Sequence, residues 1–323
     1  MWWFLLFLGT WAEAKKCRAL SLSGGGSHGA YEAGVFKALV ENLSSEEVEY
    51  NVVVGISAGS LNAIGIAQWA MGEESQASQF LQDLWEGLDG YHSVFQNWNL
   101  GIVSGLLSHS GLFDTEPLRQ TLKSALREKV ARNITLGATN INDGSYGMFT
   151  EALGNLGIVE AGMCSSAIPA VFPIQNFQGA LWIDGGVTDN NDIASAVERC
   201  LEVTGNEADI VVDMINCGSS TLAPPSGSLN TIDILLRQYQ LNSYDKGMRY
   251  LSQAVNAFPE VTFRYYAQPS ESLPGIIPLD FKQEDLEESI SIGVKDGKYL
   301  VDNNIYAKQI LENHQKSTWI EYP

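Results

Sequence analysis

Three short apolar runs along this chain each end in a glycine-rich segment, and this pattern limits the fold more than any other feature. The segments are residues 24–31 (GGGSHGAY), 55–59 (GISAG) and 184–186 (DGG). Apolar runs that alternate with helical patterns are typical of a parallel sheet, whose strands end at one common edge. The sequence therefore predicts a three-layer α/β/α fold with a mostly parallel central sheet, and it predicts that the three segments meet at that edge.

Apolar periodicity sets the expected elements. The run at 51–56 is apolar throughout, as in a strand covered on both faces. Residues 221–228 have the composition of a surface loop, and the pattern beyond residue 230 predicts helices around a strand near 261–266. Other strands are expected at 18–23, 133–138, 181–184 and 210–215, and helices at 31–41, 58–70, 115–129 and 192–203. No repeat or linker divides the chain, so we expect one domain over 15–323, with the motifs in a core of about 18–216.

The charge balance narrows the classes of partner. Lys and Arg number 19 against 38 Asp and Glu, which gives a net charge of -19 at pH 7. Such an acidic surface repels phosphate backbones, so we expect no nucleic-acid partner. It also disfavours a polybasic membrane anchor, so any contact with lipid must be mainly apolar. A soluble enzyme and a soluble binding protein remain.

The chain opens on an apolar run, MWWFLLFLG, followed by Ala12-Glu13-Ala14. The run is about half the roughly 20 residues of a spanning helix. It predicts a signal peptide over residues 1–14, a mature chain without a transmembrane segment, and a location in the secretory pathway, either secreted or in the endolysosomal lumen. Because no Lys or Arg precedes the run, a buried first strand or helix is the alternative.

Cysteines and glycosylation sequons bear on the same question. An exported chain with an even number of cysteines permits disulfides. Cys17 precedes the first strand and Cys200 ends a helix that leads into a strand, so both are expected at one edge of the sheet and are the favoured pair. Four buried free thiols, with Cys164 and Cys217, are the alternative. Sequons at Asn42 and Asn133 are typical of a glycoprotein.

The first segment suggests an anion site. Glycines leave backbone N–H groups unobstructed at the start of a helix, where a phosphate or a reacting oxyanion is stabilised. Gly24, Gly26 and Gly29 also fit the GxGxxG pattern of dinucleotide-binding folds. Those folds need an acidic residue at the end of the second strand, and this strand ends at Ile56-Ser57 without one. A nucleotide-binding protein is therefore the weaker hypothesis.

The other two segments offer a nucleophile and a base. Ser57 lies in a strand-to-helix turn with flanking glycines, the setting of a serine nucleophile; an N-cap serine is the alternative. Asp184 ends an apolar strand, where partial burial would raise its pKa toward that of a useful base; a turn aspartate is the alternative. His92, His109 and His314 do not complete a conventional triad, and His314 lies in a polar C-terminal helix.

Together these motifs resemble the patatin-like phospholipases, lipid acyl hydrolases with a Ser-Asp dyad. The resemblance rests on residues 24–34 (GGGSHGAYEAG), GISAG, DGG and the segment 165–173. It implies ester cleavage in glycerolipids or phospholipids at a membrane or micelle surface, through an acyl-enzyme and without metal or cofactor. The implied site comprises the nucleophile Ser57, the base Asp184, an oxyanion hole in Gly24, Gly25, Gly26 and Gly29, the elbow glycines Gly55 and Gly59, and the DGG glycines Gly185 and Gly186.

Two departures from the family pattern carry expectations. His28 stands where family members usually carry Arg or Lys, so a protonated His28 would lend charge to the oxyanion and activity would gain from mild acidity. Asp192 stands where a Pro is common, which concerns only the local turn. An acyl pocket lined or covered by apolar side chains is also expected, with core packing as the alternative: Trp85, Phe95, Trp98, Leu100, Ile102, Leu106 and Leu107. The rival function is a lipid-binding or storage protein with the same fold and little turnover.

Overall fold

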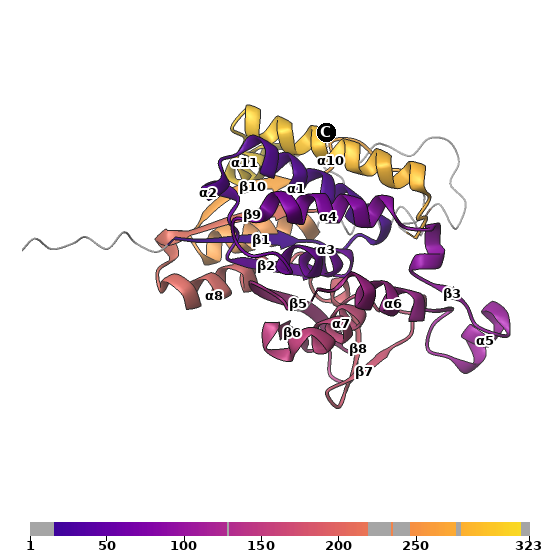
Figure 1. Ribbon diagram of the computed structural model, residues 1–323. Coiled ribbons are helices and arrows are strands. Elements are labelled where there is room, and N and C mark those ends of the chain that lie inside the picture. The colour runs from indigo at the N-terminus through magenta and orange to yellow at the C-terminus, as the bar shows by residue number, and fades with distance from the viewer. Residues whose placement is uncertain (1–15, 128, 219–233, 235–245, 276–278, 318–323) are drawn as a thin grey trace, which may run out of the picture.

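The computed structural model describes residues 16–127, 129–218, 234, 246–275 and 279–317 (Figure 1). Its centre is an eight-stranded sheet, whose strands are β1 (Cys17–Leu22), β2 (Val52–Ile56), β5 (Asn133–Asn140), β6 (Tyr146–Thr150), β7 (Gln175–Phe177), β8 (Ala180–Asp184), β9 (Ile210–Ile215) and β10 (Thr262–Ala267). The order is β10-β9-β1-β2-β5-β8-β7, and β6 also pairs with β5. Strands β10 to β5 run parallel, whereas β6, β7 and β8 join antiparallel. The predicted mostly parallel sheet is confirmed.

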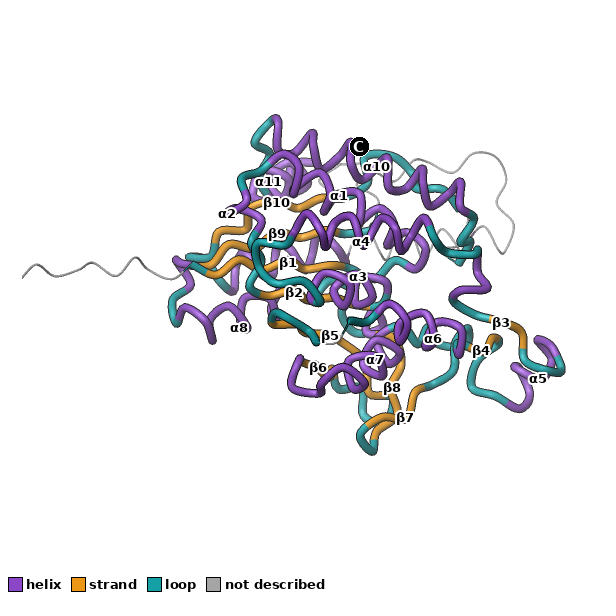
Figure 2. Tube along the Cα trace, viewed as in Figure 1, coloured by secondary structure: helices purple, strands orange, loops and turns teal. Residues whose placement is uncertain are grey.

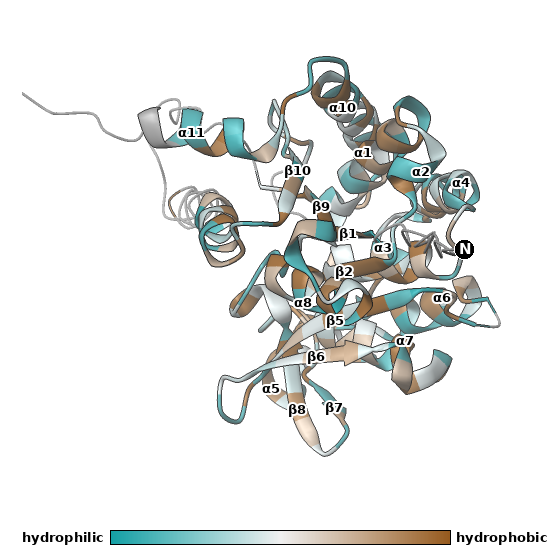
Figure 3. Ribbon diagram, turned by 90° about the vertical axis from the view of Figure 1, so that its left-hand side faces the viewer, coloured by the Kyte–Doolittle hydropathy of each residue, from teal (hydrophilic) through white to brown (hydrophobic). Residues whose placement is uncertain are grey.

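Helices cover both faces of this sheet (Figure 2). They are α1 (Gly29–Asn42), α2 (Ser45–Val48), α3 (Ala58–Ala67), α4 (Glu74–Glu86), α5 (Gly101–Ser108), α6 (Glu116–Ala125), α7 (Gly154–Ser165), α8 (Ile193–Thr204), α10 (Gln283–Asp302) and α11 (Ala307–Ser317). Residues 246–257 are helical as well. Figure 3 shows α1, α3, α4 and α10 on one side of the strands, and α8 and α11 on the other. This is the expected three-layer arrangement.

The two layers of core follow from the alternation of side chains along the strands. Leu20 and Val53 point into the cluster formed with α1 and α3. Ala19, Val52 and Val212 point into the opposite cluster, formed with α8 and residues 246–257. Strand β2 is buried at every position, because both of its faces are covered.

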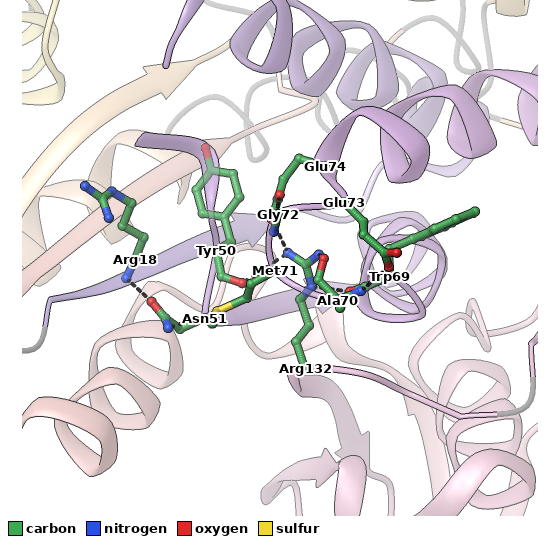
Figure 4. Close-up of polar contacts among 10 residues, drawn as sticks. All are labelled: Arg18, Tyr50, Asn51, Trp69, Ala70, Met71, Gly72, Glu73, Glu74 and Arg132. Atoms are coloured by element: carbon green, nitrogen blue, oxygen red, sulfur yellow. Dashed lines mark hydrogen bonds and ion pairs between the residues drawn. The ribbon is translucent and has the colours of Figure 1, made fainter. Parts of the chain in front are cut away.

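A buried arginine fixes the far end of α3 (Figure 4). Arg132 donates to the carbonyl oxygens of Trp69 and Ala70 at 2.7 Å each, and to that of Tyr50 at 3.1 Å. Its Nη1 also lies 2.8 Å from Glu74 Oε1, and both side chains are buried. A cation that binds carbonyls just past a helix C-terminus is favourable there. The contacts tie the end of α3 to the starts of α4 and β5.

The favoured cysteine pair is confirmed. Cys17 and Cys200 form a disulfide that joins the start of β1 to α8, with Cα atoms 5.5 Å apart. Cys164 and Cys217 are free and buried.

Several boundaries differ from the expectation. The helix expected over 115–129 ends at Ala125, and α4, α7, β6 and β7 were not predicted. The signal peptide at 1–14 and the loop at 221–228 lie outside the described residues. In the part of the chain that is described, no helix has the length and apolarity to span a bilayer.

Candidate active site

Ser57 occupies a strained turn between β2 and α3. Its φ is 52°, in the left-handed region that residues with a side chain rarely adopt. The turn is tight because backbone atoms pack against Gly55 and Gly59: an added Cβ would lie 2.2 Å from Gly59 O at Gly55, and 2.5 Å from Leu22 O at Gly59. These glycines permit the sharp turn that presents Ser57 at the carboxyl edge of the sheet, as the sequence predicted.

Two hydroxyl groups hold this turn from the protein side. The Ser57 N–H donates to Ser165 Oγ at 2.9 Å, and Ser60 Oγ donates to the Ser57 carbonyl at 2.6 Å. All three residues are buried. Ser57, at the positive N-terminal end of α3, is therefore held through both its N–H and its carbonyl group.

The structure brings Asp184 to Ser57. The side chains of Asp184 and Ser57 lie close enough to interact, and Asp184 Oδ1 accepts the Gly186 N–H at 2.7 Å. Burial raises the pKa of Asp184 to about 6, and the bonds from Ser57 and Gly186 oppose part of that rise. An added Cβ on Gly185 would meet Gly137 O at 2.5 Å, so the turn after Asp184 packs directly on β5. At neutral pH the Asp184 carboxyl group beside Ser57 is therefore mainly ionised.

The glycines of the first segment divide into two groups. The Gly24 N–H donates to Asn190 O at 3.0 Å, and the Gly29 N–H donates within the turn to Gly26 O. Neither N–H is available to a bound oxyanion, so Gly24 and Gly29 contribute close packing instead: an added Cβ on Gly24 would lie 3.1 Å from Ser57 Cβ. The N–H groups of Gly25 and Gly26 have no protein acceptor among the described residues.

A buried polar network supports this segment from below. Ser23 Oγ accepts the Cys217 N–H at 2.8 Å and lies 3.4 Å from Glu32 Oε1. Asn62 Nδ2 donates to Glu32 Oε2 and to the Gly29 carbonyl, each at 2.9 Å. Burial raises the pKa of Glu32 to about 8, against the effect of the hydrogen bond from Asn62. Glu32 is therefore mainly protonated at pH 7, and it ties α1 and α3 together beneath the glycines.

His28 does not carry the charge expected of it. Its Nε2–H donates to the Pro274 carbonyl at 3.1 Å, and burial lowers the pKa of the ring below its usual 6.5. The hydrogen bond to Pro274 favours the charged ring, but burial outweighs it and favours the neutral imidazole, contrary to the charge expected of His28 in mild acid. His109 stacks on Trp98, His92 contacts Tyr91 with tilted rings, and neither histidine is among the residues that line the pocket.

An apolar pocket with an empty volume of about 660 Å³, including its open mouth, begins at Ser57 and Gly26. Most of its lining is aliphatic or aromatic and comes from α3, α4, α6 and residues 166–172, among them Leu61, Trp85, Leu118, Leu122 and Phe172. Of the expected pocket residues, Trp85 lines this space, and Phe95 is buried against Phe172. The residues expected from α5 and its flank do not line it: Leu100, Ile102, Leu106 and Leu107 are exposed, and Trp98 lies beside them.

Sequence reasoning missed Ser165 and Asn190. Asn190 Nδ2 donates to the Gly24 carbonyl at 3.1 Å, so Asn190 clamps the glycine segment through both its backbone and its side chain. Asp192, the second departure from the family pattern, caps α8 by accepting the Ser195 N–H at 2.9 Å. A serine at the end of an apolar helix and an asparagine just after DGG are the signals that could have found the first two. In the described residues, no three His, Cys, Asp or Glu side chains group as a metal site.

Comparison with known proteins bears on this arrangement. The sequence profile described as "Patatin-like phospholipase" matches residues 20–197. The human protein named 1-acylglycerol-3-phosphate O-acyltransferase PNPLA3 is 26% identical over 181 residues, which is 55% of this chain and 35% of that protein. The chain thus spans about a third of the length of this relative. VipD from Legionella pneumophila, of known structure, aligns with 90% of this chain and 67% of its own at a TM-score of 0.47 and 13% identity.

The profile covers Ser57, Asp184 and all the glycines of the three segments. It also spans more than half of the chain. This chain therefore belongs to the patatin-like phospholipase family.

Proposed function

We propose that this protein is a lipid acyl hydrolase that cleaves carboxylic ester bonds of glycerolipids or phospholipids with Ser57 and Asp184. The observation that carries the proposal is that Asp184, a buried carboxyl with a raised pKa, lies beside Ser57 at the end of an apolar pocket. Family membership supports the lipid class of substrate. The pocket supports an acyl chain as the group that is bound, because its lining offers few polar partners.

In the first step, Asp184 takes the hydroxyl proton of Ser57, and Ser57 Oγ attacks the ester carbonyl carbon. The N–H groups of Gly25 and Gly26 are the donors that we assign to the resulting oxyanion, where one such donor is typically worth about 3 kcal/mol. The bond to the alkoxy oxygen then breaks. The leaving alcohol takes the proton from Asp184, and the acyl group stays on Ser57.

In the second step, water gives a proton to Asp184 and attacks the acyl carbonyl. The fatty acid leaves, and Ser57 regains its proton from Asp184. The name of the human relative includes an acyltransferase activity. Transfer of the acyl group to an alcohol of a lysolipid, in place of water, is therefore the second candidate fate of the same intermediate.

A fluorophosphonate probe tests the nucleophile directly. The protein should be labelled covalently at Ser57, and Ser57→Ala should lose both the label and at least about 10³-fold of its ester hydrolysis. Ser166→Ala is the matched control, because Ser166 lines the same pocket but donates its hydroxyl to Gly162 O. A protein that binds lipid without turnover, or one that binds NAD, would remain unlabelled. Absence of the label would therefore exclude the hydrolase.

A panel of phospholipids, galactolipids and triacylglycerols, with and without a chelator, then identifies the substrate class. Products are separated by mass spectrometry, so free fatty acid distinguishes hydrolysis from transfer to added lysolipid. Activity that disappears with the chelator would contradict a dyad that works without metal.

We also propose that the protein passes through the secretory pathway. The Cys17–Cys200 disulfide supports this proposal, because such bonds persist mainly in oxidising compartments. Sequencing the N-terminus of protein secreted by a eukaryotic host should find a chain that begins at Lys15. Retention of residues 1–14 would contradict the signal peptide.

A further inference from the structure

One segment projects from the body of the protein at the carboxyl edge of the sheet. Strands β3 (Gln96–Asn97) and β4 (Phe113–Asp114) form a small antiparallel ribbon, and α5 lies between them. We call residues 96–114 the apolar arm. Figure 1 shows α5 beyond α6, on the side of the molecule toward which β1 and β2 point.

The apolar arm is held together by its own contacts. The Trp98 ring stacks on His109 with centroids 3.7 Å apart, and Trp98 Nε1–H donates to the Gly111 carbonyl at 3.0 Å. An added Cβ on Gly105 would lie 2.4 Å from Leu112 O, so α5 packs closely on the returning chain. These contacts leave the large apolar side chains of α5 without a role in the fold.

Those side chains face solvent. Leu100 is 83% exposed, Leu107 78% and Leu106 71%, and Ile102 and Val103 are exposed as well. None of them belongs to either core cluster. Residues 97–112 contain no Asp, Glu, Lys or Arg, although the chain carries a net charge of -19. Apart from Asp114 at its base, the arm is thus an uncharged apolar projection on a strongly acidic protein.

The base of the arm is joined to the rim of the pocket. The Leu112 N–H donates to Ala170 O and the Phe113 N–H to Val171 O, each at 3.0 Å. Phe113 also packs on Phe95, which contacts Phe172 in the pocket lining. A surface that receives the arm therefore lies next to the pocket that begins at Ser57.

We propose that the apolar arm inserts into the surface of a lipid bilayer and so places the pocket against its substrate. This inference rests on the proposed lipid hydrolase. A bilayer accepts a convex apolar projection without a complementary groove, and a Trp at the base of the projection is typical of the membrane interface. A second copy of the chain is a weaker occupant, because two chains of charge -19 repel each other.

Vesicle binding tests the arm. The double variant Leu106→Asp/Leu107→Asp should bind phosphatidylcholine vesicles at least about tenfold more weakly than the parent in a flotation assay. Leu156→Asp is the matched control, because Leu156 is 74% exposed on α7 and lies outside the arm. Binding of the parent should change little between 0.05 and 0.5 M salt, since apolar insertion is not screened. Equal loss in both variants, or no loss in the double variant, would overturn the proposal.

A fluorescent label on the arm distinguishes lipid from a second copy. Val103→Cys provides an exposed thiol, whereas the native cysteines are paired or buried. An environment-sensitive dye at this position should shift to the blue when phosphatidylcholine vesicles are added, and a dye at Leu156→Cys should not. A blue shift that follows protein concentration without vesicles would indicate self-association and would contradict the bilayer.

Hydrolysis of a small water-soluble ester, p-nitrophenyl butyrate, separates the arm from the chemistry. The double variant should retain this activity within about twofold, because neither leucine contacts the pocket. If the parent hydrolyses no ester and takes no fluorophosphonate, the proposed function fails. If it hydrolyses the soluble ester but the arm variants bind vesicles normally, only the arm proposal fails.

Discussion

The backbone N–H of Ser57 and the hydroxyl of Ser165 are joined by a 2.9 Å hydrogen bond across 108 residues of sequence. Ser165 is the last residue of α7, and its side chain is fully buried. A residue with a side chain held at positive φ costs of order 1–3 kcal/mol, so the turn at Ser57 depends on such external contacts. Ser57, the proposed nucleophile, is thus held in place by a helix that contributes none of the proposed reacting groups.

Ser165→Ala should therefore impair both folding stability and turnover. The buried N–H of Ser57 would lose its acceptor, which costs about 1–3 kcal/mol in the free energy of unfolding. We expect kcat for p-nitrophenyl butyrate to fall while KM changes little, because the displaced group is the nucleophile and not the pocket. Ser166→Ala, one residue away, should leave kcat within about twofold. Equal kcat in the two variants would contradict a positioning role for Ser165.

Activity should rise with pH through the pKa of Asp184. Burial raises this pKa to about 6, and the base must be ionised to accept the serine proton. We expect kcat/KM for the soluble ester to increase about tenfold per pH unit below 6 and to level off above about 7. This is the reverse of the gain in mild acid expected from a charged His28. A His28→Gln variant should keep the same profile, and a maximum near pH 5 would contradict Asp184 as the base.

Glu32 should make the protein less stable in alkali. Its pKa is about 8 in the folded protein against an ordinary value of 4.5, so the folded state keeps a proton that the unfolded state releases. The stability from this proton is complete below about pH 4.5 and is lost as the pH rises through about 8. Glu32→Gln should remove this dependence. Urea unfolding measures this effect. Between pH 5 and pH 8, the free energy of unfolding of the variant should rise relative to that of the parent by more than about 1.4 kcal/mol, the equivalent of one pKa unit.

The same experiment contains its control. Asp184→Asn removes a carboxyl whose pKa is raised to about 6. The effect of this variant on the free energy of unfolding should therefore be confined to the lower part of the pH range. If the stability of Glu32→Gln falls with pH in parallel with the parent, Glu32 does not hold the extra proton.

Loss of the Cys17–Cys200 disulfide should destabilise the protein. The bond closes a loop across 183 residues, and removing a native disulfide typically costs about 2–5 kcal/mol. The double variant Cys17→Ala/Cys200→Ala should therefore unfold at a lower urea concentration than the parent. Treatment of the parent with a reductant should reproduce the shift, and the same reductant should leave the double variant unchanged. A parent that does not respond to reductant would contradict the cross-link.

The three strand-end motifs predicted the parallel part of the sheet and the meeting of their three segments, because strands that alternate with helices run parallel and end at one edge. The requirement for Gly55 is local, because an added Cβ there would meet Gly59 O, whereas the requirement for Gly59 comes from Leu22 O at the end of β1. Strands β6 and β7 were not predicted, and neither was the antiparallel direction of β8, the strand expected at 181–184. These directions follow from tertiary pairing of β6 and β8 with β5 and of β7 with β8, which no periodicity records.

The apolar arm shows a different limit. Leu100, Leu106 and Leu107 were expected to line or cover an acyl pocket, with core packing as the alternative, whereas all three face solvent. Periodicity identifies which face of a helix is apolar but not what covers that face. In the same way, the sequence indicated glycine N–H groups near the serine but not that Asn190 occupies the one at Gly24.

Strand β1 lies between the Cys17–Cys200 disulfide and the glycine segment that begins at Gly24. The sulfur atoms therefore lie at the opposite end of the strand from every group assigned to ester cleavage. We therefore expect a reducing environment to shorten the lifetime of the folded protein without lowering the rate of ester cleavage by the molecules that remain folded.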